Sequence, residues 1–200
     1  MTAVTKASFL FAHGAGAPSS SAWMRAWRDR LGTLGEVATF DYPYMRAGRK
    51  TPDKLPALIA AHKEALVEVR ARAQGPIFLV GKSMGGRVGC HLALEESVAG
   101  VICLGYPLVA GASGAVRDEV LLALRTPILF VQGTRDSLCP LPRLESVRAR
   151  MTAPNTVHIV EGGNHSLELT SARKKPATQA AADAAVLDAI GQFVAAAQSR

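Results

Sequence analysis

The sequence of 200 residues has no long uninterrupted hydrophobic run. Its longest nearly apolar stretches, such as residues 98–112, contain glycine and proline and are shorter than the ~20 residues that a membrane-spanning helix needs. The apolar run after Lys6 covers only residues 7–12 and is not followed by the small-residue cleavage site of a secretory signal. We therefore expect no membrane span and a cytoplasmic protein.

Cysteine is also scarce. The three cysteines have no C-x-x-C spacing, and Cys90 and Cys103 lie within apolar segments. This pattern is typical of buried free thiols rather than of a disulfide framework or a zinc site. We expect neither a metal ion nor another cofactor.

Acidic residues are fewer than basic ones, 16 against 23, which gives a net charge of +7. The basic side chains are spread along the chain, mostly at helical spacing, instead of forming one block. A solvated surface explains this distribution better than a nucleic-acid footprint does, so no nucleic-acid partner is expected.

Short apolar runs alternate with longer stretches in which apolar residues recur every three or four positions. This alternation predicts repeated strand–helix units around a parallel sheet. The predicted strands cover residues 8–11, 36–40, 77–80, 100–104, 128–131 and 156–160, and the predicted helices residues 22–31, 55–73, 84–95, 118–124, 141–150 and 178–197. The expected fold is α/β: a single domain over residues 1–200, with a three-layer α/β/α sandwich and a mainly parallel sheet of about six strands.

The segment Gly81-Lys82-Ser83-Met84-Gly85 lies between an apolar strand pattern and a helical pattern. This is the context that a nucleophile elbow requires, because a strand must turn sharply into a helix and leave the serine exposed above the sheet. Side chains at positions 81 and 85 would collide with the neighbouring backbone. Ser83 is the predicted nucleophile, and a merely structural turn is the alternative.

A serine hydroxyl needs a base, and the base needs an acid that orients it. His165 lies in the glycine-rich loop after the last predicted strand, whereas the other four histidines lie in helix or strand patterns or beside the first strand. Asp136 ends the segment after the fifth strand, which gives the chain order Ser, Asp, His. Asp41 is the rival acid, but it would break that order.

Small residues follow the first strand in Ala12-His13-Gly14-Ala15-Gly16. Such a turn brings a backbone N–H to a reacting carbonyl, so the amides of Ala15 and Met84 are the predicted oxyanion hole, with Gly14 as the alternative donor. A glycine-rich turn that merely passes over the sheet is the competing interpretation. His13 is expected to brace this loop by hydrogen bonds.

Gly81-Lys82-Ser83 also matches the end of the phosphate-binding pattern G-x-x-x-x-G-K-[ST]. The first glycine of that pattern would be residue 76, which is Pro76, and residues 77–80 are strand-like. A phosphate cradle needs a flexible loop that presents N–H groups, so this interpretation is rejected.

Four segments resemble motifs of the α/β-hydrolase superfamily, and together they span most of the chain: His13-Gly14, Gly81-Lys82-Ser83-Met84-Gly85-Gly86, Gln132-Gly133-Thr134-Arg135-Asp136 and Gly162-Gly163-Asn164-His165. Lys82 and the segment Gly105-Tyr106-Pro107-Leu108 resemble motifs of a small branch of predicted hydrolases. That branch includes testis-expressed and histone-acetyltransferase-complex homologues, and the dienelactone hydrolases are its better understood relatives. The resemblance implies hydrolysis of an ester, thioester or related acyl bond. Unlike fuller members, this chain has no predicted N-terminal hairpin and no room for a helical lid.

The hypothesis is therefore a serine hydrolase acting on a small acyl substrate, as a monomer or homodimer. A catalytically inactive scaffold on the same fold is the alternative. Candidate substrate-binding residues lie just beyond strand ends or on the first helix, and core packing is the alternative for each: Tyr106, Leu108, Leu138, Leu167 and Trp23. Four basic residues lie in the connection after the second strand: Arg46, Arg49, Lys50 and Lys54. A solvated loop is the favoured interpretation of this cluster, and attraction of an anionic substrate is the alternative.

Overall fold

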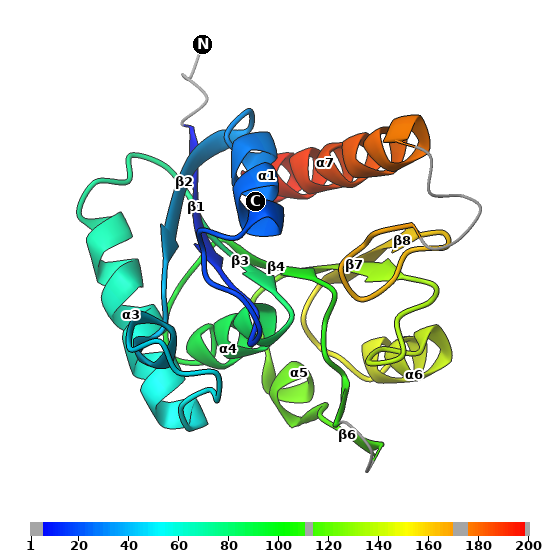
Figure 1. Cartoon of the computed structure of the whole chain (residues 1–200), viewed down its shortest axis with the longest axis horizontal. Coiled ribbons are helices and arrows are strands. Elements are labelled where there is room, and N and C mark those ends of the chain that lie inside the picture. The colour runs from blue at the N-terminus through cyan, green and yellow to red at the C-terminus, as the bar shows by residue number, and fades with distance from the viewer. Residues whose placement is uncertain (1–5, 111–113, 170–175, 199–200) are drawn as a thin grey trace.

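A parallel sheet of six strands forms the centre of the molecule (Figure 1). The computed structural model describes residues 6–110, 114–169 and 176–198. In spatial order the strands are β2 (Gly35–Phe40), β1 (Ala7–Ala12), β3 (Ile77–Lys82), β4 (Gly100–Leu104), β7 (Ile128–Gly133) and β8 (Asn155–Val160). Every residue of β1, β4 and β7 is buried, whereas the edge strands β2 and β8 are partly exposed. The apolar sequence runs are thus explained by helices that cover both faces.

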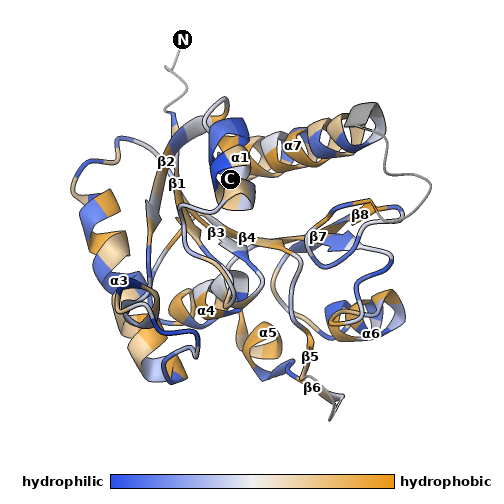
Figure 2. Cartoon of the chain, viewed as in Figure 1, coloured by the Kyte–Doolittle hydropathy of each residue, from blue (hydrophilic) through white to orange (hydrophobic). Residues whose placement is uncertain are grey.

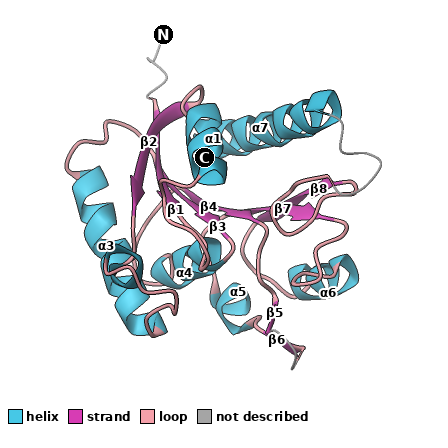
Figure 3. Cartoon of the chain, in the orientation of Figure 1, coloured by secondary structure: helices cyan, strands magenta, loops and turns pink. Residues whose placement is uncertain are grey.

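Helices pack on both faces of this sheet (Figure 3). On one face lie α1 (Ala22–Leu31) and α7 (Pro176–Gln198), and on the other lie α3 (Leu55–Arg70), α4 (Met84–Leu92), α5 (Glu119–Ala123) and α6 (Leu141–Arg148). In Figure 2 much of α4 and most of α5 have the colour of hydrophobic residues, as expected for helices packed against the sheet. The predicted three-layer α/β/α architecture is confirmed.

Helix α7 buries Val186 and Ile190 against the sheet, and Phe193 packs on Phe78 with ring centres 6.1 Å apart. An apolar stripe of the helix thus faces the sheet. Among the described residues, Thr178–Gln198 is the one helix long and apolar enough to cross a membrane, which the sequence pattern had not led us to expect.

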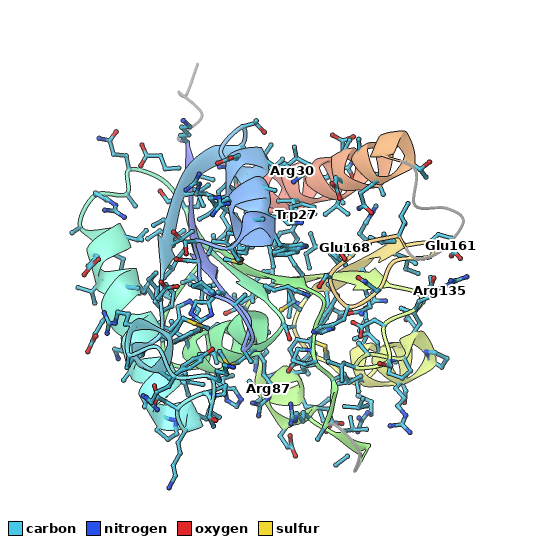
Figure 4. All side chains as sticks on the ribbon, in the orientation of Figure 1. Trp27, Arg30, Arg87, Arg135, Glu161 and Glu168 are labelled. Atoms are coloured by element: carbon cyan, nitrogen blue, oxygen red, sulfur yellow. The ribbon has the colours of Figure 1, made fainter. Side chains whose placement is uncertain are left out.

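Helices α1 and α7 are also joined by a charged pair. Arg30 of α1 donates to Asp183 of α7 at 2.6 Å, and its guanidinium lies 5.2 Å from the centre of the Trp27 ring (Figure 4). These contacts join the C-terminal end of α1 to α7 on the same face of the sheet.

The predicted strands and long helices are present, with ends that differ by three residues or fewer. Two features were not predicted: helix α2 (Pro43–Arg46) and a short antiparallel hairpin of β5 (Val109–Ala110) and β6 (Ala115–Val116). Proline is favoured at the start of a helix, so Pro43 begins α2 instead of breaking it. In the described part of the connection between β4 and β7, helix α5 buries Val120 and Leu121 in the core, so it does not act as a lid.

Candidate active site

Ser83 occupies a strained turn between β3 and α4. Its φ of 50° and ψ of −116° lie outside the regions that residues with side chains favour. The N–H of Ser83 donates to the carbonyl oxygen of Leu104 at 3.1 Å, which ties the turn to the neighbouring strand. Strain of this kind costs on the order of 1–3 kcal/mol and is concentrated at functional sites.

The flanking glycines permit this turn. A Cβ on Gly81 would lie 2.0 Å from the nitrogen of Gly86, and a Cβ on Gly85 would lie 2.5 Å from the carbonyl oxygen of Ala12. Both distances are shorter than any real contact, so a side chain at either position would force the strand and helix apart. The structure therefore supplies the steric reason for the glycines of the motif.

Three polar side chains meet at the carboxyl edge of the sheet. His165 Nε2 lies 2.7 Å from Ser83 Oγ, and His165 Nδ1 lies 2.7 Å from Asp136 Oδ2. Since a carboxylate accepts, Nδ1 carries the imidazole proton and Nε2 is free to accept from the serine hydroxyl. The rival acid Asp41 instead accepts the N–H of Ser19 at 2.7 Å, so the structure brings Asp136, and not Asp41, to His165.

Asp136 is buried and fully hydrogen-bonded. Burial raises the pKa of its carboxyl, but the hydrogen bond and charge of His165, together with donors from Gln132 and Leu138, bring the pKa below its ordinary value. Gln132 is fully buried on β7, where its other amide atom accepts the N–H of Tyr106 at 3.1 Å. This role of Gln132 was not predicted, although a glutamine inside an apolar strand is a usable signal.

His165 belongs to the β8 loop (residues 161–168), which the protein holds firmly. Asn164 Oδ1 accepts the N–H groups of Ser166 and Glu168 at 2.8 and 3.0 Å, and Gln179 of α7 donates to the carbonyl of Leu167 at 3.2 Å. Leu167 has a φ of 62° and is 1% exposed, so its buried side chain pins an unfavourable backbone conformation. Glu168, labelled in Figure 4, ends this loop.

The β1 loop (residues 13–17) lies against the serine turn. A Cβ on Gly14 would be 3.5 Å from Ser83 Cβ, so the two turns are in direct contact. His13 is fully buried: its Nδ1 donates to the carbonyl of Gly14 at 2.6 Å, and its Nε2 accepts the N–H of Tyr42 at 3.1 Å. Burial lowers the pKa of His13, against opposing contributions from Gly14 and Asp41. Tyr44 also braces the loop, because its hydroxyl donates to the carbonyl of Ala15 at 3.0 Å.

A cavity of about 370 Å³ opens beside Ser83 and His165. Small side chains dominate its walls, and its lining consists of Gly14, Ala15, Gly16, Ala17, Ser21, Trp23, Met24, Lys82, Ser83, Leu138, His165, Ser166 and Glu168. A larger groove of about 550 Å³ lies between β8 and α7, but Ser83, His165 and Asp136 do not line it. The smaller cavity is therefore the candidate active site, although it is not the largest hollow.

The predicted substrate-contacting residues divide into two groups. Trp23 and Leu138 line the cavity, whereas Tyr106, Leu108 and Leu167 do not. These last three are 1% exposed or less because their side chains point into the hydrophobic core. Their assignment to the pocket wall is corrected: they follow strand ends, but they pack inwards.

The basic connection does not reach this cavity. Arg46, Arg49, Lys50 and Lys54 are exposed and are not among the lining residues, and Arg49 pairs with Asp53 at 2.6 Å. Within residues 6–110, 114–169 and 176–198, no cluster of three His, Cys, Asp or Glu side chains is placed to bind a metal ion. Cys90, Cys103 and Cys139 are free and buried.

Comparisons with known proteins agree with this architecture. The family described as an alpha/beta hydrolase domain matches residues 5–195. A serine hydrolase homologue from Coxiella burnetii is 18% identical with a TM-score of 0.73, over 92% of this chain and 85% of that one. Dienelactone hydrolase from Anabaena variabilis is 19% identical with a TM-score of 0.69, over 95% and 86%.

A third solved structure is similar over nearly the whole chain. Est1E from Butyrivibrio proteoclasticus, solved with ferulic acid bound, is 15% identical with a TM-score of 0.68, over 97% of this chain and 92% of that one. At such identities the solved structures support the fold alone. The family match, however, extends over nearly the whole chain, and the protein is therefore a member of the α/β-hydrolase superfamily.

Proposed function

We propose that this hydrolase cleaves a small ester, thioester or related acyl substrate, with Ser83 as nucleophile, His165 as general base and Asp136 as the acid that orients it. One observation carries the proposal. The two hydrogen bonds of 2.7 Å link Ser83 Oγ, the His165 imidazole and Asp136 Oδ2 in one chain, beside a cavity. That is the arrangement by which a weak hydroxyl nucleophile is activated.

The reaction has two halves. In the first, His165 Nε2 takes the proton of Ser83 Oγ as the oxygen attacks the substrate carbonyl, and the imidazolium then protonates the leaving group. In the second, His165 takes a proton from water as the water attacks the acyl carbonyl, and it returns that proton to Ser83 Oγ as the acyl–oxygen bond breaks and the acid leaves. Asp136 holds the tautomer and stabilises the imidazolium throughout.

Backbone donors stabilise the oxyanion in this scheme. Met84 begins α4, so its N–H belongs to the first turn, where the donors have no acceptor within the helix and the helix dipole favours negative charge. The second donor comes from Ala15 or, alternatively, Gly14, because the β1 loop contacts the serine turn. The buried His13 contributes by holding that loop, not by exchanging protons with substrate.

The cavity supports a small substrate. Its volume of about 370 Å³ is near the lower end of the roughly 300–1,000 Å³ that ligand pockets occupy. Trp23 and Leu138 offer apolar surface for a short acyl or alcohol group. A short aromatic ester such as p-nitrophenyl acetate is therefore a suitable first substrate.

The test is the Ser83→Ala variant, measured by p-nitrophenyl acetate turnover and by labelling with a fluorophosphonate probe. We expect turnover to fall by about 10⁴-fold or more and labelling to disappear, because the attacking oxygen is gone. The matched control is Ser146→Ala, which removes an exposed serine on α6 and should change neither readout.

Two outcomes would overturn the proposal. Persistent labelling of Ser83→Ala would place the nucleophile elsewhere. A folded wild-type protein that hydrolyses none of several short esters and thioesters would instead favour a binding or scaffold role for the fold.

A further inference from the structure

Lys82 ends β3 immediately before Ser83, and its side chain reaches the β8 loop. The ammonium Nζ donates a hydrogen bond to the main-chain oxygen of His165. It also lies 5.2 Å from the centre of the Trp23 ring, within the range of a cation–π interaction. The residue beside the serine therefore contacts the main chain of the residue that carries the imidazole.

The next carbonyl of the same loop accepts a hydrogen bond from a second side chain. Trp23 of α1 donates its indole N–H to the oxygen of Ser166 at 2.9 Å. Beneath the loop, Gly105 has a φ of 70°, and a Cβ there would lie 2.4 Å from the oxygen of His165. The fold thus brings the His165 carbonyl close to β4 and fixes two successive carbonyls with side-chain donors.

This arrangement has an electrostatic cost. Burial lowers the pKa of Lys82 to about 8, although the carboxylates of Asp136 and Glu168 act in the opposite direction. A methionine would fill similar space without desolvating an ammonium. An amine that is kept in such surroundings, next to reactive groups, is a candidate for a functional role.

We propose that Lys82 is a positioning residue: its contact with the His165 main chain, supported by Trp23, sets the alignment of the imidazole with Ser83. This inference rests on the proposed hydrolase function. The bond from Asp136 limits rotation of the imidazole ring, but it does not locate the backbone that carries the ring. Lys82 locates that backbone relative to Ser83 itself, because it is the neighbouring residue in the chain.

The first test compares Lys82→Met and Lys82→Arg with wild type on two p-nitrophenyl esters, the neutral acetate and the anionic monosuccinate. Lys82→Met should lower kcat by about 10- to 100-fold on both esters, as small misalignments do, with little change in KM. Lys82→Arg keeps a charged donor and should recover part of this loss. Lys63→Met, which removes a lysine on α3 that pairs with Glu96, is the matched control and should behave as wild type.

The pH profile gives a second readout. Asp136, Glu168 and the His165 imidazole are the titratable groups that face Lys82. As pH rises through about 8, Lys82 loses its charge and donates a weaker bond, so wild-type kcat should decline. Lys82→Met should lack this alkaline decline, and Lys82→Arg should move it to higher pH because the guanidinium stays charged.

Amide hydrogen exchange tests the contact independently of activity. Exchange in residues 164–168 should be faster in Lys82→Met than in wild type, and Trp23→Phe should produce a smaller increase together with a smaller loss of kcat. Should Lys82→Met fail to fold, Lys82→Arg and Trp23→Phe carry the same comparison.

The outcomes separate the two proposals. Unchanged kcat in Lys82→Met, or an unchanged exchange rate in the β8 loop, would overturn the positioning role alone. A rise in KM restricted to the succinate ester would also overturn it, because Lys82 would then bind an anionic substrate group. A wild-type protein inactive on both esters would instead count against the proposed hydrolysis.

Discussion

The β1 loop and the β8 loop each place a histidine at the same edge of the sheet, but they hold it differently. His13 is fully buried, and both of its ring nitrogens bond to the backbone. The side chain of His165 is 25% exposed, and both of its ring nitrogens bond to side chains, those of Asp136 and Ser83. A histidine enclosed by backbone groups fixes a loop, whereas one placed between an acid and a hydroxyl is suited to moving a proton.

The largest difference between the two loops should appear when His165 is replaced by Gln. We expect kcat/KM on p-nitrophenyl acetate to fall by about 10⁴-fold, because the base is lost. The melting temperature should change little, since the side chain is partly exposed. A variant that kept more than a tenth of wild-type activity would remove His165 from the role of base.

Gly105→Ala should have the next largest effect, because the new Cβ would lie 2.4 Å from the His165 oxygen. Displacement of the β8 loop should reduce kcat by about 10- to 100-fold. The control is Gly89→Ala within α4, where the nearest atom would be 3.6 Å away; there, stability should stay level or rise. Equal kinetics for the two variants would show that the β8 loop tolerates displacement.

His13→Leu should affect stability more than chemistry. It leaves the N–H of Tyr42 buried without its acceptor, which costs about 1–3 kcal/mol. Urea unfolding should shift accordingly, while kcat/KM should fall only about 10-fold through loosening of the β1 loop. An activity loss as large as that of His165→Gln, in a variant of normal stability, would contradict the contrast between the two histidines.

The smallest expected effect is on stability and comes from His62, which packs behind the β1 loop through Tyr42. Tyr42 links His13 to His62, whose Nδ1 lies 3.2 Å from the Tyr42 hydroxyl. Burial lowers the pKa of His62 to about 3, with a smaller contribution from His13. The folded pKa of His62 is below its unfolded value, so neutral His62 stabilises the folded state. This contribution to the free energy of unfolding is fully present above about pH 6.5 and is lost progressively as pH falls below it.

Between pH 7 and pH 5.5, His62 should therefore account for a loss of about 1 kcal/mol in the free energy of unfolding. Urea titrations of wild type and His62→Gln at both pH values measure this difference. If the variant loses as much stability as wild type over this interval, proton uptake by His62 in the unfolded state is not the cause.

The sheet, its helices and the positions of Ser83, Asp136 and His165 at one edge were predictable, because periodicity shows where each strand ends and these three residues each follow a strand end. The direction of a side chain after a strand is not local. Tyr106 and Leu108 follow β4 as a pocket wall would, yet both point into the core.

The supporting residues were harder to predict for a related reason. The hydrogen-bond partners of Gln132 and Lys82 lie outside the strands that carry these two residues. Their types and spacing alone do not indicate those partners. Only the three-dimensional arrangement shows why an amide and an amine are kept where apolar side chains would pack more easily.

The left-handed backbone of Leu167 has a consequence for redesign of this protein. Its side chain is part of the hydrophobic core, so changes to the β8 loop would disturb folding and chemistry together. Ala17, Ser21 and Leu138 line the cavity beside Ser83 and His165 and belong to other segments. Libraries intended to alter substrate range should therefore vary these three positions and leave residues 164–167 untouched.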